Sequence, residues 1–358
     1  MVGMREMLED MVARGASDLH LTAGLPPQYR VDGDMQSSEY GILTGEDTRR
    51  LAYSIINEEQ KKRFENEREL DFSFGIQGIS RFRANVFMQR GVTSMAIRQI
   101  PYQIHSFEEL GLPPVCRELI NRTQGLVLVT GPTGSGKSTT LATMVDTVNR
   151  TRSGHIITIE DPIEYVHQHK KCIVNQREVN NDTKSFTAAL KYVLRQDPDV
   201  ILIGEMRDRE TIAAALTISE TGHLALATLH TNSTFESINR IIDVFPPEQQ
   251  NQVRTQLSFC LAGVITQQLI PRAKGSGRVL CLEIMVCTPA IKAMIRDNKT
   301  HQLYGTLQAG QKFGMQTMNQ SLYQAVENRW ITQDNAVARS TDPAELLQMF
   351  GEPVRVGK

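Results

Sequence analysis

The stretch GLVLVTGPTGSGKS, residues 125–138, decides the fold of this chain of 358 residues. Its first part, 125–130, is an apolar run typical of a buried strand. The second part, 131–138, fits the GxxxxGK[ST] pattern of a phosphate-binding loop, which lies between a strand and a helix. The glycines let backbone N–H groups point inwards at an anion, and the following helix adds positive partial charge at its N-terminus. The stretch therefore predicts a nucleotide site in an α/β fold.

The loop residues predict partners for both ATP and Mg²⁺. We expect Lys137 to neutralise the β- and γ-phosphate oxygens, and we expect the hydroxyl of Ser138 to bind Mg²⁺. The predicted nucleotide ligands are Gly131, Pro132, Thr133, Gly134, Ser135, Gly136, Lys137, Ser138 and Thr139.

After the prolines and glycines of 101–114, short apolar segments alternate with longer helical segments. We expect strands at 125–130, 155–160, 199–205, 224–230 and 279–286. We expect a helix at 209–220, a helical region at roughly 248–270 and a mainly helical tail from about residue 289. This order predicts a largely parallel sheet flanked by helices.

Acidic residues follow two of these strands. The run DVILIGE ends in Glu205, which we expect to hold Mg²⁺ directly or through a water. The next acids, Glu160, Asp161 and Glu164, stand at the end of strand 155–160. Because parallel strands end at one edge of a sheet, these acids can converge on the γ-phosphate. Hydrolysis needs a group that orients or deprotonates water, and the sequence leaves Glu160 and Glu164 both open for that role.

Two histidines flank the strand LALATL. We assign His230 to the catalytic group, because it follows the strand and can hydrogen-bond the γ-phosphate, and we assign His223 to nucleotide binding. The alternative for isolated histidines is a structural role. A metal role is not expected, because no third ligand stands at suitable spacing.

The first hundred residues predict a small α+β domain. We expect a helix at 4–14, short strands at 18–21 and 29–31, a helical region from Thr44 to about 67, and antiparallel strands within 70–99. In 81–88 apolar and polar residues alternate, so the arginines face away from the core. Prolines and glycines in 101–114 indicate a linker.

Composition excludes several classes of protein. The net charge of −1 gives no sign of the basic field of a nucleic-acid binder. No apolar run reaches the roughly 18 residues that span a bilayer, and the N-terminus does not read as a secretory signal. Five cysteines without a CxxC pair suit reduced thiols in the cytoplasm, and we expect Cys281 and Cys287 to be core thiols rather than metal ligands.

Several long stretches resemble the type II and type IV secretion ATPases, and in particular the PilT-type pilus retraction ATPases. They are GASDLHLTAGLPPQYRVDG, RFRANVF, AIRQIP, GPTGSGKSTT, TIEDPIEYVH, LRQDPDVILIGEMRDRET, TGHLALATLHT and GMQTMNQSL. The resemblance covers almost the whole chain. It implies a PAS-like domain at 1–100, the linker at 101–114, and a RecA-like ATPase domain with a helical C-terminal region at 115–358.

The resemblance also implies function and partners. A homohexamer is expected to hydrolyse ATP and power pilus retraction for twitching motility, with Arg81, Arg83 and Arg98 reaching the nucleotide. The implied partners are a PilC-type platform protein and a PilU-type paralogue, with no nucleic acid, and the implied location is the cytoplasm at the inner membrane. Extension and secretion ATPases usually carry an extra N-terminal domain and a tetracysteine zinc motif. This sequence shows neither feature, so the resemblance favours a retraction ATPase.

Three alternatives stay open. The first is another pilus ATPase: the stretch AIKAMIRD, 290–297, departs from the AIRNLIRE motif of retraction ATPases, which keeps a PilU-type accessory open, and an extension or secretion ATPase is the other member of this alternative. A nucleic-acid-dependent P-loop motor shares the same core. A scaffold that binds ATP without turnover is the third, and the intact lysine and acids argue against it.

Overall fold

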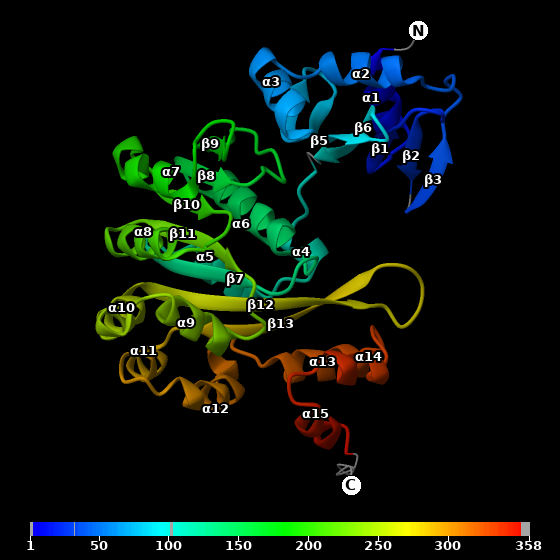
Figure 1. Cartoon of the computed structure of the whole chain (residues 1–358). Helices are drawn as coiled ribbons and strands as arrows, with labels where there is room; N and C mark the ends of the chain where they lie inside the picture. The colour runs from blue at the N-terminus through cyan, green and yellow to red at the C-terminus, as the bar shows by residue number, and fades with distance from the viewer. Residues whose placement is uncertain (1–2, 32, 101–102, 352–358) are drawn as a thin grey trace. The chain divides into compact units, whose positions relative to one another are not determined.

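The computed structural model describes residues 3–31, 33–100 and 103–351. The chain divides into two compact units, residues 1–103 together with 164–166, and residues 104–163 together with 167–358 (Figure 1). The proposed linker 101–114 begins at two residues outside the described ranges, and its remainder contains the short helix α4 (Phe107–Leu110) and the first residue of α5 (Pro114–Ile120).

The first unit is a six-stranded antiparallel sheet with helices, in the strand order β3-β2-β1-β6-β5-β4. Its elements are α1 (Met4–Ala13), β1 (Asp18–Leu21), β2 (Gln28–Val31), β3 (Asp34–Ser37), α2 (Gly45–Tyr53), α3 (Glu58–Glu67), β4 (Glu69–Ile76), β5 (Ser80–Gln89) and β6 (Val92–Ile100). The single predicted helical region after Thr44 is therefore two helices, and β3 was not predicted.

Alternation along the strands builds the core of this unit. Phe82 and Ala84 of β5 are fully buried, whereas Arg81 and Arg83 lie on the opposite face, as predicted. The turn from β5 to β6 is formed by Arg90 and Gly91, both with positive φ, of 49° and 80°, which suits the two-residue loops of β-hairpins.

The second unit is built on a seven-stranded sheet in the order β13-β12-β7-β11-β10-β8-β9. Neighbouring strands are parallel except for β12 and β13. The strands are β7 (Gly125–Thr130), β8 (Gly154–Glu160), β9 (Cys172–Glu178), β10 (Val200–Ile203), β11 (Leu224–Leu229), β12 (Leu261–Pro271) and β13 (Arg278–Val286). The largely parallel sheet confirms the predicted fold class.

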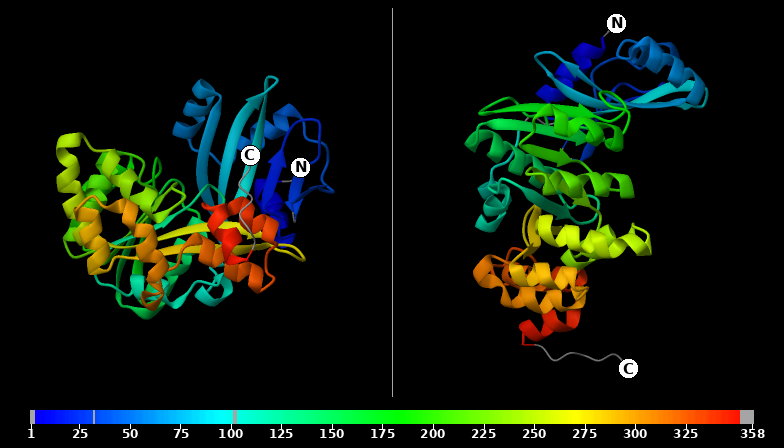
Figure 2. Two further views of the ribbon diagram at one scale, coloured as in Figure 1. Left: turned by 90° about the horizontal axis from the view of Figure 1, so that it is seen from below. Right: turned by 90° about the vertical axis from the view of Figure 1, so that its left-hand side faces the viewer.

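Helices cover both faces of this sheet. One face shares a core with α7 (Phe186–Val193), α8 (Arg209–Glu220), α9 (Thr234–Asp243), α10 (Pro247–Cys260), α11 (Pro289–Arg296) and α12 (Leu303–Ala309). The other face shares a core with α4, α5 and α6 (Lys137–Thr151). A further core lies between the β12–β13 hairpin and α13 (Met318–Glu327), α14 (Gln333–Arg339) and α15 (Pro343–Met349). Figure 2 shows these last helices, in orange and red, beside the yellow hairpin.

The predicted helix at roughly 248–270 is wrong in its second half. Helix α10 ends at Cys260, and β12 begins at Leu261, whose backbone is extended. β-branched residues at 264–266 favour a strand. A Cβ on Gly263 would lie 2.8 Å from the carbonyl oxygen of Met285, so glycine allows β13 to pair closely here. The edge strand β9 was also not predicted.

Two further sequence predictions concern membrane-spanning segments and the cysteine side chains. No helix among the described residues is long and apolar enough to cross a membrane. Cys281 and Cys287 are both buried in the second unit, which confirms that they pack in its core.

Candidate nucleotide site

The carboxyl ends of four parallel strands place the predicted chemistry at one edge of the second sheet. Because β7, β11, β10 and β8 are consecutive parallel neighbours, residues that follow them share this edge. The phosphate loop follows β7, His230 follows β11, Glu205 follows β10, and Glu160 ends β8. These four groups therefore share one edge of the sheet.

The phosphate loop has the backbone that the pattern requires. Gly131, Gly134 and Gly136 all have positive φ, of 140°, 78° and 87°, and the loop runs into the 15-residue helix α6 at Lys137. The ammonium of Lys137 donates to the carbonyl oxygens of Gly131 and Pro132, at 2.9 and 3.1 Å. Turned N–H groups, a helix N-terminus and a lysine together fit the phosphates of a nucleotide.

Gly131 is the loop glycine with the least space for a side chain. A Cβ there would lie 2.4 Å from the carbonyl oxygen of Gln267 and 2.7 Å from Oγ of Ser135, whereas a Cβ on Gly134 would meet nothing within 4 Å. Both positions carry the penalty of positive φ. We expect Gly131→Ala to lose about 3 kcal/mol, a fall of roughly 6–10 °C in melting temperature, and Gly134→Ala about 1 kcal/mol. Thermal unfolding of both variants checks this, and equal melting temperatures would contradict it.

Glu205 is the best-defined acid of the site. One of its carboxylate oxygens lies 2.7 Å from Nε of Arg207 and 3.2 Å from Nε2 of His230. Burial disfavours the charged form, but the hydrogen bond and positive charge of Arg207, together with the contact to His230, outweigh burial, so the pKa of Glu205 is lowered. The site therefore holds an ionised carboxylate, the type of ligand that Mg²⁺ prefers.

Backbone contacts fix the segment that carries Glu205. The Gly204 N–H donates to the Ile159 carbonyl at 2.8 Å, and a Cβ on Gly204 would lie 3.2 Å from Cα of Glu160. The hydroxyl of Thr228 donates to the Gly204 carbonyl at 2.5 Å. Glycine at 204 thus brings the ends of β10, β8 and β11 together.

Glu160 is oriented by two donors. The Thr158 hydroxyl lies 2.6 Å from Oε1 of Glu160, and Nε2 of Gln176 lies 3.2 Å from the same oxygen. Thr158 stands two residues earlier on β8 and so points to the same side, and Gln176 lies opposite Thr158 on β9. The sequence reasoning did not single out either donor.

His223 is not brought to this edge, which corrects its assignment to nucleotide binding. It directly precedes β11 and lies beside Gly125, the first residue of β7. The N–H of Gly125 donates to the His223 carbonyl. At about 3.3 Å per residue, the length of β7 separates it from the phosphate loop of the same chain by roughly 20 Å. Its ring instead lies 3.1 Å from the Thr221 hydroxyl.

The remaining predicted groups lie in the first unit. Arg81, Arg83 and Arg98 stand on β5 and β6, and Arg83 is directly opposite Arg98. Nε of Arg98 lies 2.8 Å from a carboxylate oxygen of Asp18. Glu164 also groups with the first unit. A role of these residues at the nucleotide stays a prediction.

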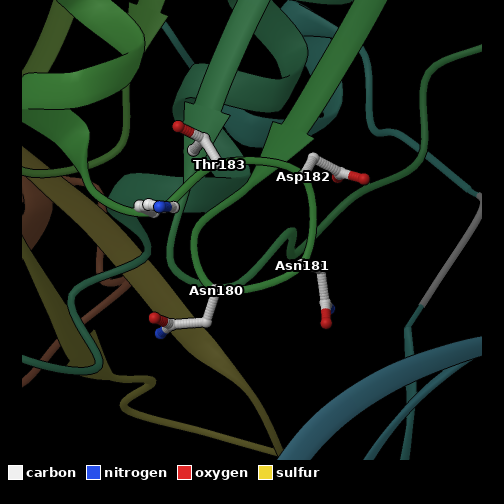
Figure 3. Close-up of a pocket in the computed structure, with 5 residues that line it drawn as sticks. Asn180, Asn181, Asp182 and Thr183 are labelled. Carbon is white, nitrogen blue, oxygen red and sulfur yellow. The ribbon is translucent and has the colours of Figure 1, made fainter. Parts of the chain in front are cut away.

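A pocket of about 310 Å³ lies at the loop that follows the carboxyl end of β9 and leads to α7, and it is lined by residues 180–184. Figure 3 shows the side chains of Asn180, Asn181 and Asp182 pointing away from one another. Because these polar groups do not converge, the pocket adds nothing to the site at the strand ends.

Comparison with known proteins places the chain in a family. Residues 2–338 match the family described as type II/IV secretion system protein. The type IV pilus retraction ATPase PilT of Pseudomonas aeruginosa is 50% identical over 338 residues, which are 94% of this chain and 98% of the relative. The type IV pilus ATPase PilU of the same organism is 43% identical over 345 residues, 96% of this chain and 90% of the relative. A crystal structure of the pilus retraction motor PilT with bound ADP has 52% identity and a TM-score of 0.92, covering 98% of this chain and all of that one.

The chain therefore belongs to the type II/IV secretion system protein family. This membership confirms the resemblance seen in the sequence, the fold class, and the prediction of a P-loop ATPase.

Proposed function

We propose that this chain is the subunit of a homohexameric motor that hydrolyses ATP to power the retraction of type IV pili, and so supports twitching motility. One observation carries the proposal. The phosphate loop, Glu205 and His230 share one edge of a parallel sheet in a chain that is 50% identical to a pilus retraction ATPase over 94% of its length.

The residues at this edge divide the work of hydrolysis. Lys137 and the loop amides would neutralise the phosphates, and Ser138 and Glu205 would hold Mg²⁺, which would neutralise charge on the phosphate oxygens. His230, held beside Glu205, hydrogen-bonds the γ-phosphate. Glu160 or Glu164 orients the attacking water, and the hydrogen bonds to Glu160 from Thr158 and Gln176 support the first of these without deciding the choice.

Arginines complete the proposed catalytic group. Arg81, Arg83 and Arg98 stabilise the charge that develops on the transferred phosphoryl group, a contribution worth about 10³–10⁵ in rate where it is made in other P-loop enzymes. Their place on neighbouring strands of one sheet face supports a common role.

The proposal extends to partners and location. The motor works in the cytoplasm at the inner membrane, on a PilC-type platform protein, and alongside a PilU-type paralogue. Support for this part comes from the resemblance to pilus ATPases alone. The domain boundaries 1–100, 101–114 and 115–358 are proposed on the same ground.

The altered motif 290–297 bears on the choice between retraction ATPase and accessory. Nζ of Lys292, on α11, donates to the carbonyl oxygen of Phe259 at the end of α10, at 3.1 Å. An ammonium makes this single contact to the helix terminus, where a guanidinium offers a planar fork of donors. The identity of 50% to PilT against 43% to PilU favours the retraction ATPase itself.

A deletion strain tests the function. We expect cells that lack the gene to carry excess surface pili that do not retract, and we expect wild-type protein, but not Lys137→Ala, to restore retraction. Cells without surface pili would indicate an extension ATPase instead. An unchanged number of pili that still retract would contradict a role in pilus dynamics.

A further inference from the structure

The phosphate loop is supported from one side by strand β12. Thr266 of β12 lies opposite Thr130, the last residue of β7, and their hydroxyls form a buried hydrogen bond of 2.7 Å. The next residue on β12 is Gln267, and the next residue after β7 is Gly131, where the loop begins. The loop therefore starts directly beside Gln267.

Gln267 contacts the loop with both backbone and side chain. Its carbonyl oxygen fills the space where a Cβ of Gly131 would stand, and its Nε2 lies 3.3 Å from the Cβ position of Gly136. The same Nε2 donates to the Ser135 carbonyl at 2.7 Å, and the whole side chain is buried. Because a carbonyl only accepts, the NH₂ group of the amide must face Ser135.

This hydrogen bond sets the direction of a loop amide. In a planar trans peptide the C=O and the N–H point in opposite directions. With the Ser135 carbonyl turned towards β12, the N–H of Gly136 in the same peptide is turned away from β12. Inward-turned N–H groups are what makes such a loop bind an anion.

The amide oxygen of Gln267 indicates that this side chain does more than fill space. Oε1 of Gln267 and Oγ of Ser135 are both buried and have no hydrogen-bond partner among the described residues. A buried polar atom without a partner lowers stability, so an apolar residue of similar length would pack here at less cost. Packing alone therefore does not account for an amide at this position.

We infer that Gln267 is a positioning residue of the nucleotide site, which holds the 135–136 peptide so that the Gly136 N–H faces the phosphates. The inference rests on the proposed function of the loop. Gln267 acts through Ser135 and does not itself touch the nucleotide. It also ties the loop to the β12–β13 hairpin, and a second contact from that hairpin runs from Arg278 to the Gly134 carbonyl, at 3.4 Å.

The chain offers a matched control in Gln268. This residue has the same side chain on the opposite face of β12, and its Nε2 donates to the Arg339 carbonyl at 3.3 Å, away from the loop. Gln267→Met and Gln268→Met therefore remove one amide each from the same strand while keeping the side-chain length.

Calorimetric titration of the purified proteins with ADP and Mg²⁺ provides the test. We expect Gln267→Met to bind ADP about tenfold more weakly and to raise KM for ATP similarly, with kcat changed by less than about threefold, because one loop hydrogen bond is lost. Gln268→Met should bind within twofold of wild type. A folded Gln267→Met that binds ADP as tightly as wild type would overturn the inference. Failure of wild type and Gln268→Met to bind ADP would instead remove the proposed function.

Gln267→Glu gives a readout that a purely structural role would not. An ionised carboxylate cannot donate to the Ser135 carbonyl, but a protonated one can, and burial raises the pKa of such a group. We expect this variant to bind ADP weakly at pH 8 and to regain affinity, relative to wild type, as the pH falls to 6. It also decides the question if Gln267→Met does not fold. A ratio of affinities that stays constant with pH would count against Gln267 as a donor.

Discussion

Lys137→Ala is expected to lower the steady-state ATPase rate by about a thousandfold, the cost of removing one donor that stabilises transition-state charge in a preorganised site. The ammonium of Lys137 lies within hydrogen-bond distance of the carbonyl oxygens of Gly131 and Pro132, so it is held inside the loop. Alanine leaves the loop amides and the helix N-terminus in place but removes the full positive charge. Release of inorganic phosphate at saturating ATP measures the effect.

Two controls make the result specific. Lys191→Ala removes an exposed lysine from α7 of the same unit, and we expect its rate to stay within twofold of wild type. Lys137→Arg keeps the charge but replaces a compact ammonium by a larger planar fork, which cannot take the same place against the Gly131 and Pro132 carbonyls, so we expect most of the loss to remain. Turnover within threefold of wild type in Lys137→Ala would contradict the assignment of the loop.

The sequence predicted the edge of the site well because the relevant signals are local. An apolar run followed by a polar group, as at Glu160 or Glu205, indicates a strand and the residue that leaves it. Parallel strands then bring such residues to one edge, whatever their distance along the chain. The two histidines stand at opposite ends of β11. The strand runs from His223 to His230, so only His230 can reach the carboxyl edge, and the direction was already present in the sequence.

The supporting residues were missed because their elements were misread. Gln267 fell within a predicted helix, since an apolar run reads as helix or strand with little to separate them. What decides the strand is tertiary: β12 pairs with β7 on one side and β13 on the other. Gln176 was missed for a similar reason, because β9 is a polar edge strand whose partner, β8, lies earlier in the chain. Thr158, two residues before Glu160 on one strand, was within reach of the period-two rule.

Glu205→Gln is expected to lower the ATPase rate by about a hundredfold or more while ADP affinity changes by only a few fold. The substitution keeps the shape of the side chain and removes its charge. Although burial raises it, the pKa of Glu205 is lowered overall by the hydrogen bond and positive charge of Arg207 and the contact to His230, so the wild-type group is a carboxylate throughout the neutral range. A loss of activity as the pH falls through the neutral range therefore belongs to the titration of another group.

The Mg²⁺ dependence of Glu205→Gln separates metal binding from general acid–base chemistry. If Glu205 holds Mg²⁺, an amide oxygen in its place weakens the site, and the variant needs several-fold more Mg²⁺ for half-maximal rate. Glu210→Gln is the matched control, because Glu210 is an exposed acid at the start of α8, paired with Arg209 rather than with the loop. We expect that variant to follow the wild-type Mg²⁺ titration. A Glu205→Gln enzyme with wild-type turnover and wild-type Mg²⁺ demand would show that the ionised carboxylate beside His230 serves the structure of the edge and not its chemistry.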